Sequence, residues 1–94
     1  MDAIITVDVG TTSMRAILYD SAGKAVSIYQ RDNPPDYHDD GRVEQAPEAW
    51  SSILVDALKD CAAKAREHGL VPRCISVTAQ RSSVIPVDIS GVPL

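Results

Sequence analysis

The stretch Asp2–Asp20 constrains the fold more than any other part of the chain. It opens with an apolar run, Ala3–Val7, that is rich in β-branched residues and has the composition of a strand buried on both faces. Asp8 stands at the end of this strand, and Gly10 follows two residues later. Because an unpaired buried carboxylate is costly, Asp8 needs a partner such as a metal ion or a bound hydrogen-bond donor. The sequence therefore predicts a buried strand that ends in an acid and a sharp turn.

The turn after this strand has the composition of an anion-binding hairpin. Gly10 permits a sharp bend and a close approach to a ligand, and three hydroxyl residues follow it, Thr11, Thr12 and Ser13. Amides and hydroxyls in such a turn can point at one anion, and Asp8 can reach a Mg²⁺ ion carried by that anion, directly or through water. A hairpin turn without a ligand is the alternative, since Gly, Thr and Ser are ordinary turn residues. The segment matches neither a Walker loop nor a dinucleotide fingerprint, because no Gly-Lys-Ser/Thr follows and Gly10 precedes a strand.

The first part of the chain is predicted to form an antiparallel meander. Its three predicted strands, joined by short turns, are Ala3–Val9, Met14–Asp20 and Lys24–Arg31. Gly23 closes the second turn at a position where a positive φ is expected. The proline- and acid-rich stretch Asp32–Glu44 is predicted to be a loop, either a solvated connector or a functional segment, with His38 exposed in it.

One long helix is predicted after this loop. Pro47 suits the first helical position and Gly69 the stop. The apolar residues recur at three- and four-residue steps and form one stripe, Trp50, Ile53, Leu54, Ala57, Leu58, Cys61, Ala62 and Ala65. This stripe predicts a helix that packs on a sheet.

A further strand, Arg73–Ala79, follows the helix and should lie parallel to an earlier strand through a right-handed crossover. Gln80, Arg81 and Ser82 stand at its carboxyl end, which is where ligands bind in open α/β sheets. Val84–Asp88 is predicted to be a short final strand at an edge or in a hairpin, because Pro86 interrupts it.

Size and composition limit the function classes. The chain has 94 residues, which suits one small domain. Its net charge of −4 and its lack of a Lys/Arg cluster argue against a nucleic-acid surface. No signal peptide or membrane span is visible, so a cytoplasmic location is expected. Cys61 and Cys74 lack metal-ligand spacing and are expected to be buried thiols, although a disulfide stays open.

Four motifs, which occur in a fixed order along essentially the whole chain, resemble those of a known protein family. They are Asp8-Val9-Gly10-Thr11-Thr12-Ser13 with Arg15, then Gly41-Arg42-Val43-Glu44-Gln45 with Pro47-Glu48-Ala49-Trp50, then Ile75-Ser76-Val77-Thr78-Ala79-Gln80-Arg81-Ser82, and finally Pro86-Val87-Asp88 with Gly91-Val92-Pro93-Leu94. In this order they resemble the start of a carbohydrate kinase of the FGGY family, the family of glycerol kinase and xylulokinase.

The resemblance implies a ribonuclease H-like, actin-like ATPase fold and transfer of the ATP γ-phosphoryl group to a hydroxyl of a sugar or polyol. It also implies site residues. Asp8 would lie near Mg²⁺–ATP, Gly10, Thr11, Thr12 and Ser13 would form the phosphate hairpin, and Arg15 would project toward the phosphates. Gln80, Arg81 and Ser82 would line the sugar pocket, with Arg81 hydrogen-bonded to substrate hydroxyls. Such catalysis is mostly positioning and charge neutralisation.

Two departures qualify the resemblance. Family members are several times longer and carry their catalytic base, adenosine site and second domain downstream, so residues 1–94 are expected to be an N-terminal portion of the first domain, inactive alone. Its open sheet edges favour self-association or a homodimer. Arg81 resembles the arginine of glycerol kinases, but Ser82 replaces the acid expected after it, and xylulokinases have Met-His after the glutamine. The substrate therefore stays open.

Two other interpretations remain. A non-enzymatic actin-fold nucleotide binder, such as an Hsp70-like module, also has an Asp-Gly-Thr-Thr type hairpin, but it has no sugar pocket for Gln80–Ser82 to line. The other is a small structural domain in which Asp8 is merely hydrogen-bonded at a turn.

Overall fold

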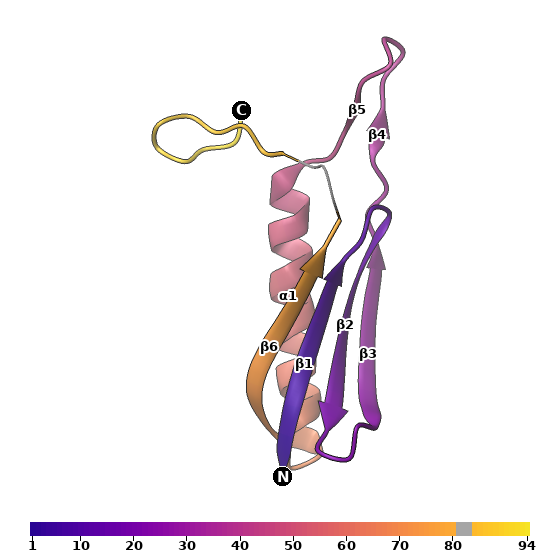
Figure 1. Cartoon of the computed structure of the whole chain (residues 1–94), viewed down its shortest axis with the longest axis vertical. Helices are drawn as coiled ribbons and strands as arrows, with labels where there is room; N and C mark the ends of the chain where they lie inside the picture. The colour runs from indigo at the N-terminus through magenta and orange to yellow at the C-terminus, as the bar shows by residue number, and fades with distance from the viewer. Residues whose placement is uncertain (81–83) are drawn as a thin grey trace.

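The computed structural model describes residues 1–80 and 84–94 and has one mixed sheet covered on one side by a helix (Figure 1). The sheet has four strands in the order β3-β2-β1-β6. Their bounds are β1 Asp2–Val9, β2 Ser13–Asp20, β3 Ala25–Asp32 and β6 Val71–Ala79. Strand β2 runs antiparallel to both of its neighbours, β1 and β3, and β6 runs parallel to β1. The meander and the parallel fourth strand are thus confirmed.

Strand β1 is buried on one face only. Ala3, Ile5 and Val7 point to the helix and are at most 4% exposed, whereas the alternate residues Ile4 and Asp8 are exposed. The prediction of a strand buried on both faces is therefore wrong for the described part of the chain. The physical reason is that α1 covers one face of the sheet, and no described element covers the other (Figure 1).

Helix α1, Pro47–Glu67, has the predicted start and the predicted apolar stripe. Pro47 stands in the first turn, where its missing N–H costs no hydrogen bond. Gly69 follows the helix with φ of 66°, a left-handed conformation that suits a helix stop. The helix packs mainly over β2 and β3, and the core is formed by small and aliphatic side chains, Ala3, Ile5, Val7, Met14, Ala16, Leu18, Ile53, Ala57, Cys61, Ala65 and Leu70.

Two similar turns use an aspartate to hold the backbone. Asp20 Oδ1 accepts hydrogen bonds from the amides of Ala22 and Lys24, both at 2.9 Å, and Gly23 has φ of 83° as predicted. Asp88 Oδ1 likewise accepts from Ser90 N at 2.8 Å and Val92 N at 3.0 Å. A side-chain oxygen that pairs with amides two and four residues later makes each turn locally determined.

The predicted loop Asp32–Glu44 contains a short hairpin, which the sequence reading missed. Strand β4, Asp36–Tyr37, pairs with β5, Val43–Glu44, and the hairpin extends beyond the end of the main sheet (Figure 1). His38 is exposed, as predicted, and its Nε2 lies 3.0 Å from Glu44 Oε1. Two paired residues on each side are too few to show a strand pattern in the sequence.

The other differences lie at the C-terminal side. Strand β6 begins at Val71, two residues earlier than predicted, and its outer edge has no strand partner within residues 1–80 and 84–94. Val84–Asp88 is not a strand, since only an isolated bridge joins Val87 to Pro93. Both cysteines are free thiols, but only Cys61 is buried. The expectation of a buried Cys74 is wrong, because β6 is exposed on both faces.

No helix in the described part of the chain is long and apolar enough to cross a membrane.

Candidate nucleotide and substrate site

The candidate site lies at the end of the sheet where β1 and β6 finish. Figure 1 shows both strands pointing to this end, with the β1–β2 turn beside them and the start of α1 nearby. The parallel register pairs Asp8 with Thr78 and Val9 with Ala79, so the two strands end side by side. The Gly10–Ser13 turn and Gln80, which are about 70 residues apart in the chain, are thereby brought to one edge.

The turn between β1 and β2 is closed by its own backbone. Gly10 N donates to Ser13 O at 2.9 Å, and Asn33 N donates to Thr12 O at 2.7 Å from the end of β3. A Cβ added at Gly10 would lie 2.9 Å from Ser13 O, so this close approach requires glycine. Thr11 and Thr12 are exposed and Ser13 is half-buried. The predicted tight turn is confirmed, with its hydroxyl residues accessible to a ligand.

Asp8 is exposed, which corrects the prediction of a buried acid. The alternation along β1 puts its side chain on the face that α1 does not cover. Its one described hydrogen bond is long, with Thr78 Oγ1 donating to Asp8 Oδ1 at 3.4 Å. The argument that burial forces Asp8 to find a partner therefore does not hold. The carboxylate is instead available to a ligand, because the described residues offer it only this one long hydrogen bond.

Arg15 lies directly across from Asp8 in the antiparallel register, yet the two side chains form no ion pair within the described residues. Arg15 Nε donates instead to Gln30 Oε1 at 3.3 Å, on the next strand. Paired residues point to the same face, so Asp8 and Arg15 share the exposed face of the sheet beside the turn. An acid that can meet a cation and a guanidinium that can meet an anion are thus available together.

The residues after β6 are placed in part. Gln80 N donates to Val9 O at 2.9 Å, which continues the pairing of β6 with β1 by one residue. The Gln80 side chain is half-buried, and its Nε2 donates to Gln45 Oε1 at 3.0 Å. Arg81 and Ser82, which the sequence assigns to the sugar pocket, lie outside the described residues.

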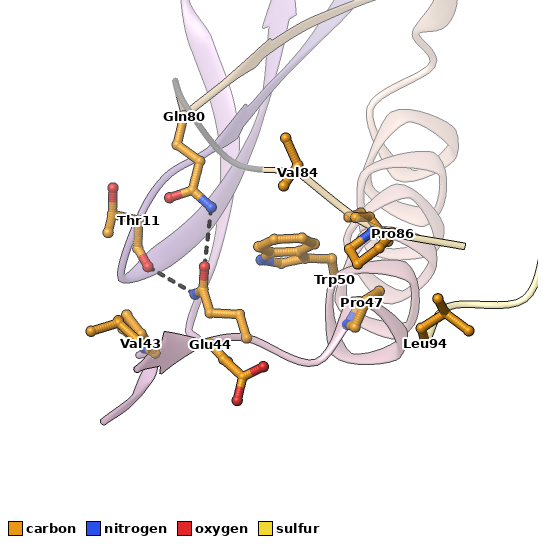
Figure 2. A pocket seen from close by; sticks show the side chains of 12 residues that line it. Thr11, Val43, Glu44, Pro47, Trp50, Gln80, Val84, Pro86 and Leu94 are labelled. Atoms are coloured by element: carbon orange, nitrogen blue, oxygen red, sulfur yellow. Dashed lines mark hydrogen bonds between the residues drawn. The ribbon is translucent and has the colours of Figure 1, made fainter. Parts of the chain in front are cut away.

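A pocket of about 500 Å³ opens beside this edge (Figure 2). It is bounded by the turn, the connector before α1, the first turn of α1 and the C-terminal segment, and is lined by Thr11, Pro35, Val43, Glu44, Gln45, Pro47, Trp50, Gln80, Val84, Ile85, Pro86 and Leu94. Trp50 Nε1 is buried and has no hydrogen-bond partner within residues 1–80 and 84–94. A hydroxyl oxygen could accept from this donor.

Sequence reasoning missed two residues of this pocket. From the sequence, Trp50 belongs only to the apolar stripe of the helix and Gln45 only to the motif before it. Their positions in the sequence offer a clue, because Gln45 precedes and Trp50 follows the start of the helix. The topology brings this helix start to the edge of the sheet where ligands bind.

A metal ion at this edge would have few protein ligands. Within residues 1–80 and 84–94, no group of three or more His, Cys, Asp or Glu side chains could hold a metal. A lone exposed carboxylate fits Mg²⁺ that keeps several waters and is also held by substrate phosphates, which is how this ion is usually bound with nucleotides. Asp8 is compatible with that role.

Comparison with known proteins identifies the relatives of this chain. The model of the FGGY family of carbohydrate kinases, N-terminal domain, matches residues 3–94. The chain belongs to the FGGY family. Two sequence relatives are glycerol kinases, one from Marinomonas sp. that is 41% identical over 97% of this chain and 19% of that protein, and one from Dichelobacter nodosus that is 37% identical over 87% and 16%.

Solved structures of FGGY kinases have the same fold. The xylulose kinase from Rhodospirillum rubrum matches with a TM-score of 0.89 and 28% identity, over 98% of this chain and 19% of that one. The Plasmodium falciparum glycerol kinase with ADP matches with a TM-score of 0.87 and 26% identity, over 100% and 19%. The predicted ribonuclease H-like, actin-like fold is thus confirmed. The chain spans about a fifth of the length of these relatives.

Membership of the FGGY family decides between two of the interpretations that the sequence left open. A carbohydrate-kinase relationship is favoured over an Hsp70-like nucleotide-binding module, because the match covers the motif segments before and after the helix as well as the hairpin.

Proposed function

We propose that this chain is the N-terminal portion of the first domain of a kinase that transfers the ATP γ-phosphoryl group to a hydroxyl of a sugar or polyol. The observation that carries the proposal is the convergence of the Gly10–Ser13 turn and Gln80 at one edge of the sheet, in a chain of the FGGY family. Phosphoryl transfer requires donor and acceptor to be held side by side, and a phosphate-binding turn and a polar substrate residue at the ends of adjacent parallel strands would hold them so.

The turn and its neighbours would hold the phosphates. Amides and hydroxyls of Gly10, Thr11, Thr12 and Ser13 can donate to phosphate oxygens, and Arg15 adds a positive charge on the same side. Asp8 would hold Mg²⁺, directly or through a bound water. When bound, the ion neutralises charge on the phosphates during transfer. The exposure of Asp8 supports this assignment, as does the absence of an ion pair between Asp8 and Arg15 in the part of the chain that the structure describes.

The acceptor would lie on the β6 side. Gln80, Arg81 and Ser82 are proposed to bind the hydroxyls of the acceptor, and the adjoining pocket has donors and apolar walls suited to a polyol. Relatives are named for glycerol, xylulose and gluconate, so these three compounds form the first panel of acceptors.

A chimera tests the proposal. Residues 1–94 replace the corresponding segment of the Marinomonas glycerol kinase, and phosphoryl transfer from Mg²⁺–ATP is measured with each acceptor. We expect transfer to at least one acceptor, and we expect the 94-residue chain alone to be inactive. An inactive chimera that is folded as well as its active parent contradicts the proposal.

An Asp8→Asn variant of the chimera tests the assigned role of Asp8. It keeps the size of the side chain and removes its charge, so kcat should fall by about 100-fold or more if Asp8 acts on the charge of the phosphate–metal complex. The matched control is Asp56→Asn, which removes a helix-surface charge paired with Arg31. An Asp8→Asn variant as active as the control would refute the role.

A further inference from the structure

Gln45 makes hydrogen bonds to three segments that the chain topology brings to the candidate site. It lies in the connector between β5 and α1. Its Nε2 donates to Thr11 O in the phosphate turn and to Asn33 O after β3, both at 2.9 Å. Its Oε1 accepts from Gln80 Nε2 at 3.0 Å. One half-buried side chain thus joins the turn, the end of the meander and Gln80, which follows β6.

These partners fix the orientation of both amides. Only the NH₂ group of Gln45 can face two backbone carbonyls, because both carbonyls are acceptors. The Oε1 of Gln45 must then face Gln80, which obliges Gln80 to present its own NH₂ group to Gln45. The carbonyl oxygen of Gln80 is left for another donor. In Figure 2 the side-chain oxygen of Gln80 lies on the side of the amide opposite the dashed hydrogen bond from its nitrogen.

We propose that Gln45 is a positioning residue, which sets the spacing between the phosphate turn and Gln80 and turns the Gln80 oxygen toward a donating hydroxyl of the acceptor. This inference rests on the proposed function and extends it to a residue that contacts neither reacting atom. Transfer needs donor and acceptor aligned to within a fraction of an ångström, so a loss of this bridge should lower kcat more than it changes nucleotide binding.

The hydrogen bonds themselves can be tested in the 94-residue chain without any activity. By NMR, the exchange of the Gln45 side-chain NH₂ hydrogens with solvent should be at least about 10-fold slower than that of Gln30, because both Gln45 hydrogens are donated. Gln30 is the internal control, since it is exposed and its NH₂ group donates to nothing within the described residues. Equal exchange rates for the two side chains would overturn the proposal.

Kinetics of the active chimera test the positioning role. Gln45→Met removes all three hydrogen bonds and keeps the length of the side chain. We expect kcat to fall by about 10- to 100-fold, with KM for ATP within about twofold of the unsubstituted chimera. Gln45→Glu should be at least as impaired, because a carboxylate would face two carbonyl oxygens. Asp56→Asn, which loses only the ion pair with Arg31, controls for a loss of stability.

A double-variant cycle asks whether Gln45 acts through Gln80. If it does, the effect of Gln45→Met on kcat should largely disappear in a Gln80→Met background. Additive effects of the two substitutions would overturn the proposal. So would a Gln45→Met chimera whose melting temperature falls while its kinetics stay unchanged, because Gln45 would then have a structural role only. An inactive unsubstituted chimera contradicts the proposed function, whereas protected Gln45 hydrogens with unchanged kinetics contradict only the positioning role.

Discussion

The close approach at Gly10 makes a quantitative prediction for Gly10→Ala. The new Cβ would lie 2.9 Å from Ser13 O, a backbone atom that no side-chain rotation can move aside. The turn must open by a few tenths of an ångström, which strains or breaks the 2.9 Å hydrogen bond from Gly10 N to Ser13 O. Losing that bond costs about 1 kcal/mol and crowding about 1–3 kcal/mol, while alanine recovers about 0.4–1 kcal/mol by restricting the unfolded chain. The net loss of unfolding free energy should be about 1–3.5 kcal/mol.

Gly23→Ala is the matched control for this prediction. Gly23 has φ of 83° but nothing within 4 Å of its added Cβ, so its cost of about 1–2 kcal/mol comes from the backbone conformation alone. Urea unfolding of the 94-residue chain measures both stabilities. Steady-state kinetics of the chimera then separate the two sites, since only Gly10→Ala should also raise KM for ATP, because only it moves the amides and hydroxyls of the phosphate turn.

Two results would refute this reasoning. A Gly10→Ala chain within about 0.5 kcal/mol of the unsubstituted chain would mean that the turn relaxes without cost, against the contact at Ser13 O. An unchanged KM for ATP, together with the expected loss of stability, would mean that the turn is structural and does not bind phosphate.

Two further predictions concern the core. Leu18 is 0% exposed, so Leu18→Ala should lower the unfolding free energy by about 2–5 kcal/mol in urea titrations. The control is Leu94→Ala at an 85% exposed position, which should cost less than about 0.5 kcal/mol. Similar losses for the two variants would contradict the packing described. Burial, and then the charge of Asp60, raise the pKa of the Cys61 thiol above its ordinary value of 9.0. The unfolded thiol therefore ionises first, so stability is fully present below about pH 9 and is lost as the pH rises further. Cys61→Ala should weaken this alkaline loss, measured as the difference in urea midpoint between pH 7.5 and about pH 10, and an unchanged difference would refute the assignment.

The local pattern of the sequence determined the elements themselves. Periodicity of two in the meander and of about 3.6 in the helix follows from which residues are apolar, and these patterns predicted β2, β3 and α1 closely. Aspartate and glycine fixed the turn at Gly23 through bonds between residues two and four positions apart. The hairpin β4–β5 escaped prediction because two paired residues a side make no period, and Val84–Asp88 failed as a strand because composition alone does not supply a partner.

Only the tertiary structure decided how the site is assembled. The sequence predicts a ligand site at Asp8 and Gly10–Ser13, but it predicts that Asp8 is buried. The exposure of Asp8 depends on which face of the sheet the helix covers. Gln45 carried no signal of its own, because its three partners are 12 to 35 residues away in the chain. Hydrogen bonds within a turn can be read from neighbouring residues, but hydrogen bonds between segments exist only after the strands have paired and the helix has crossed over the sheet.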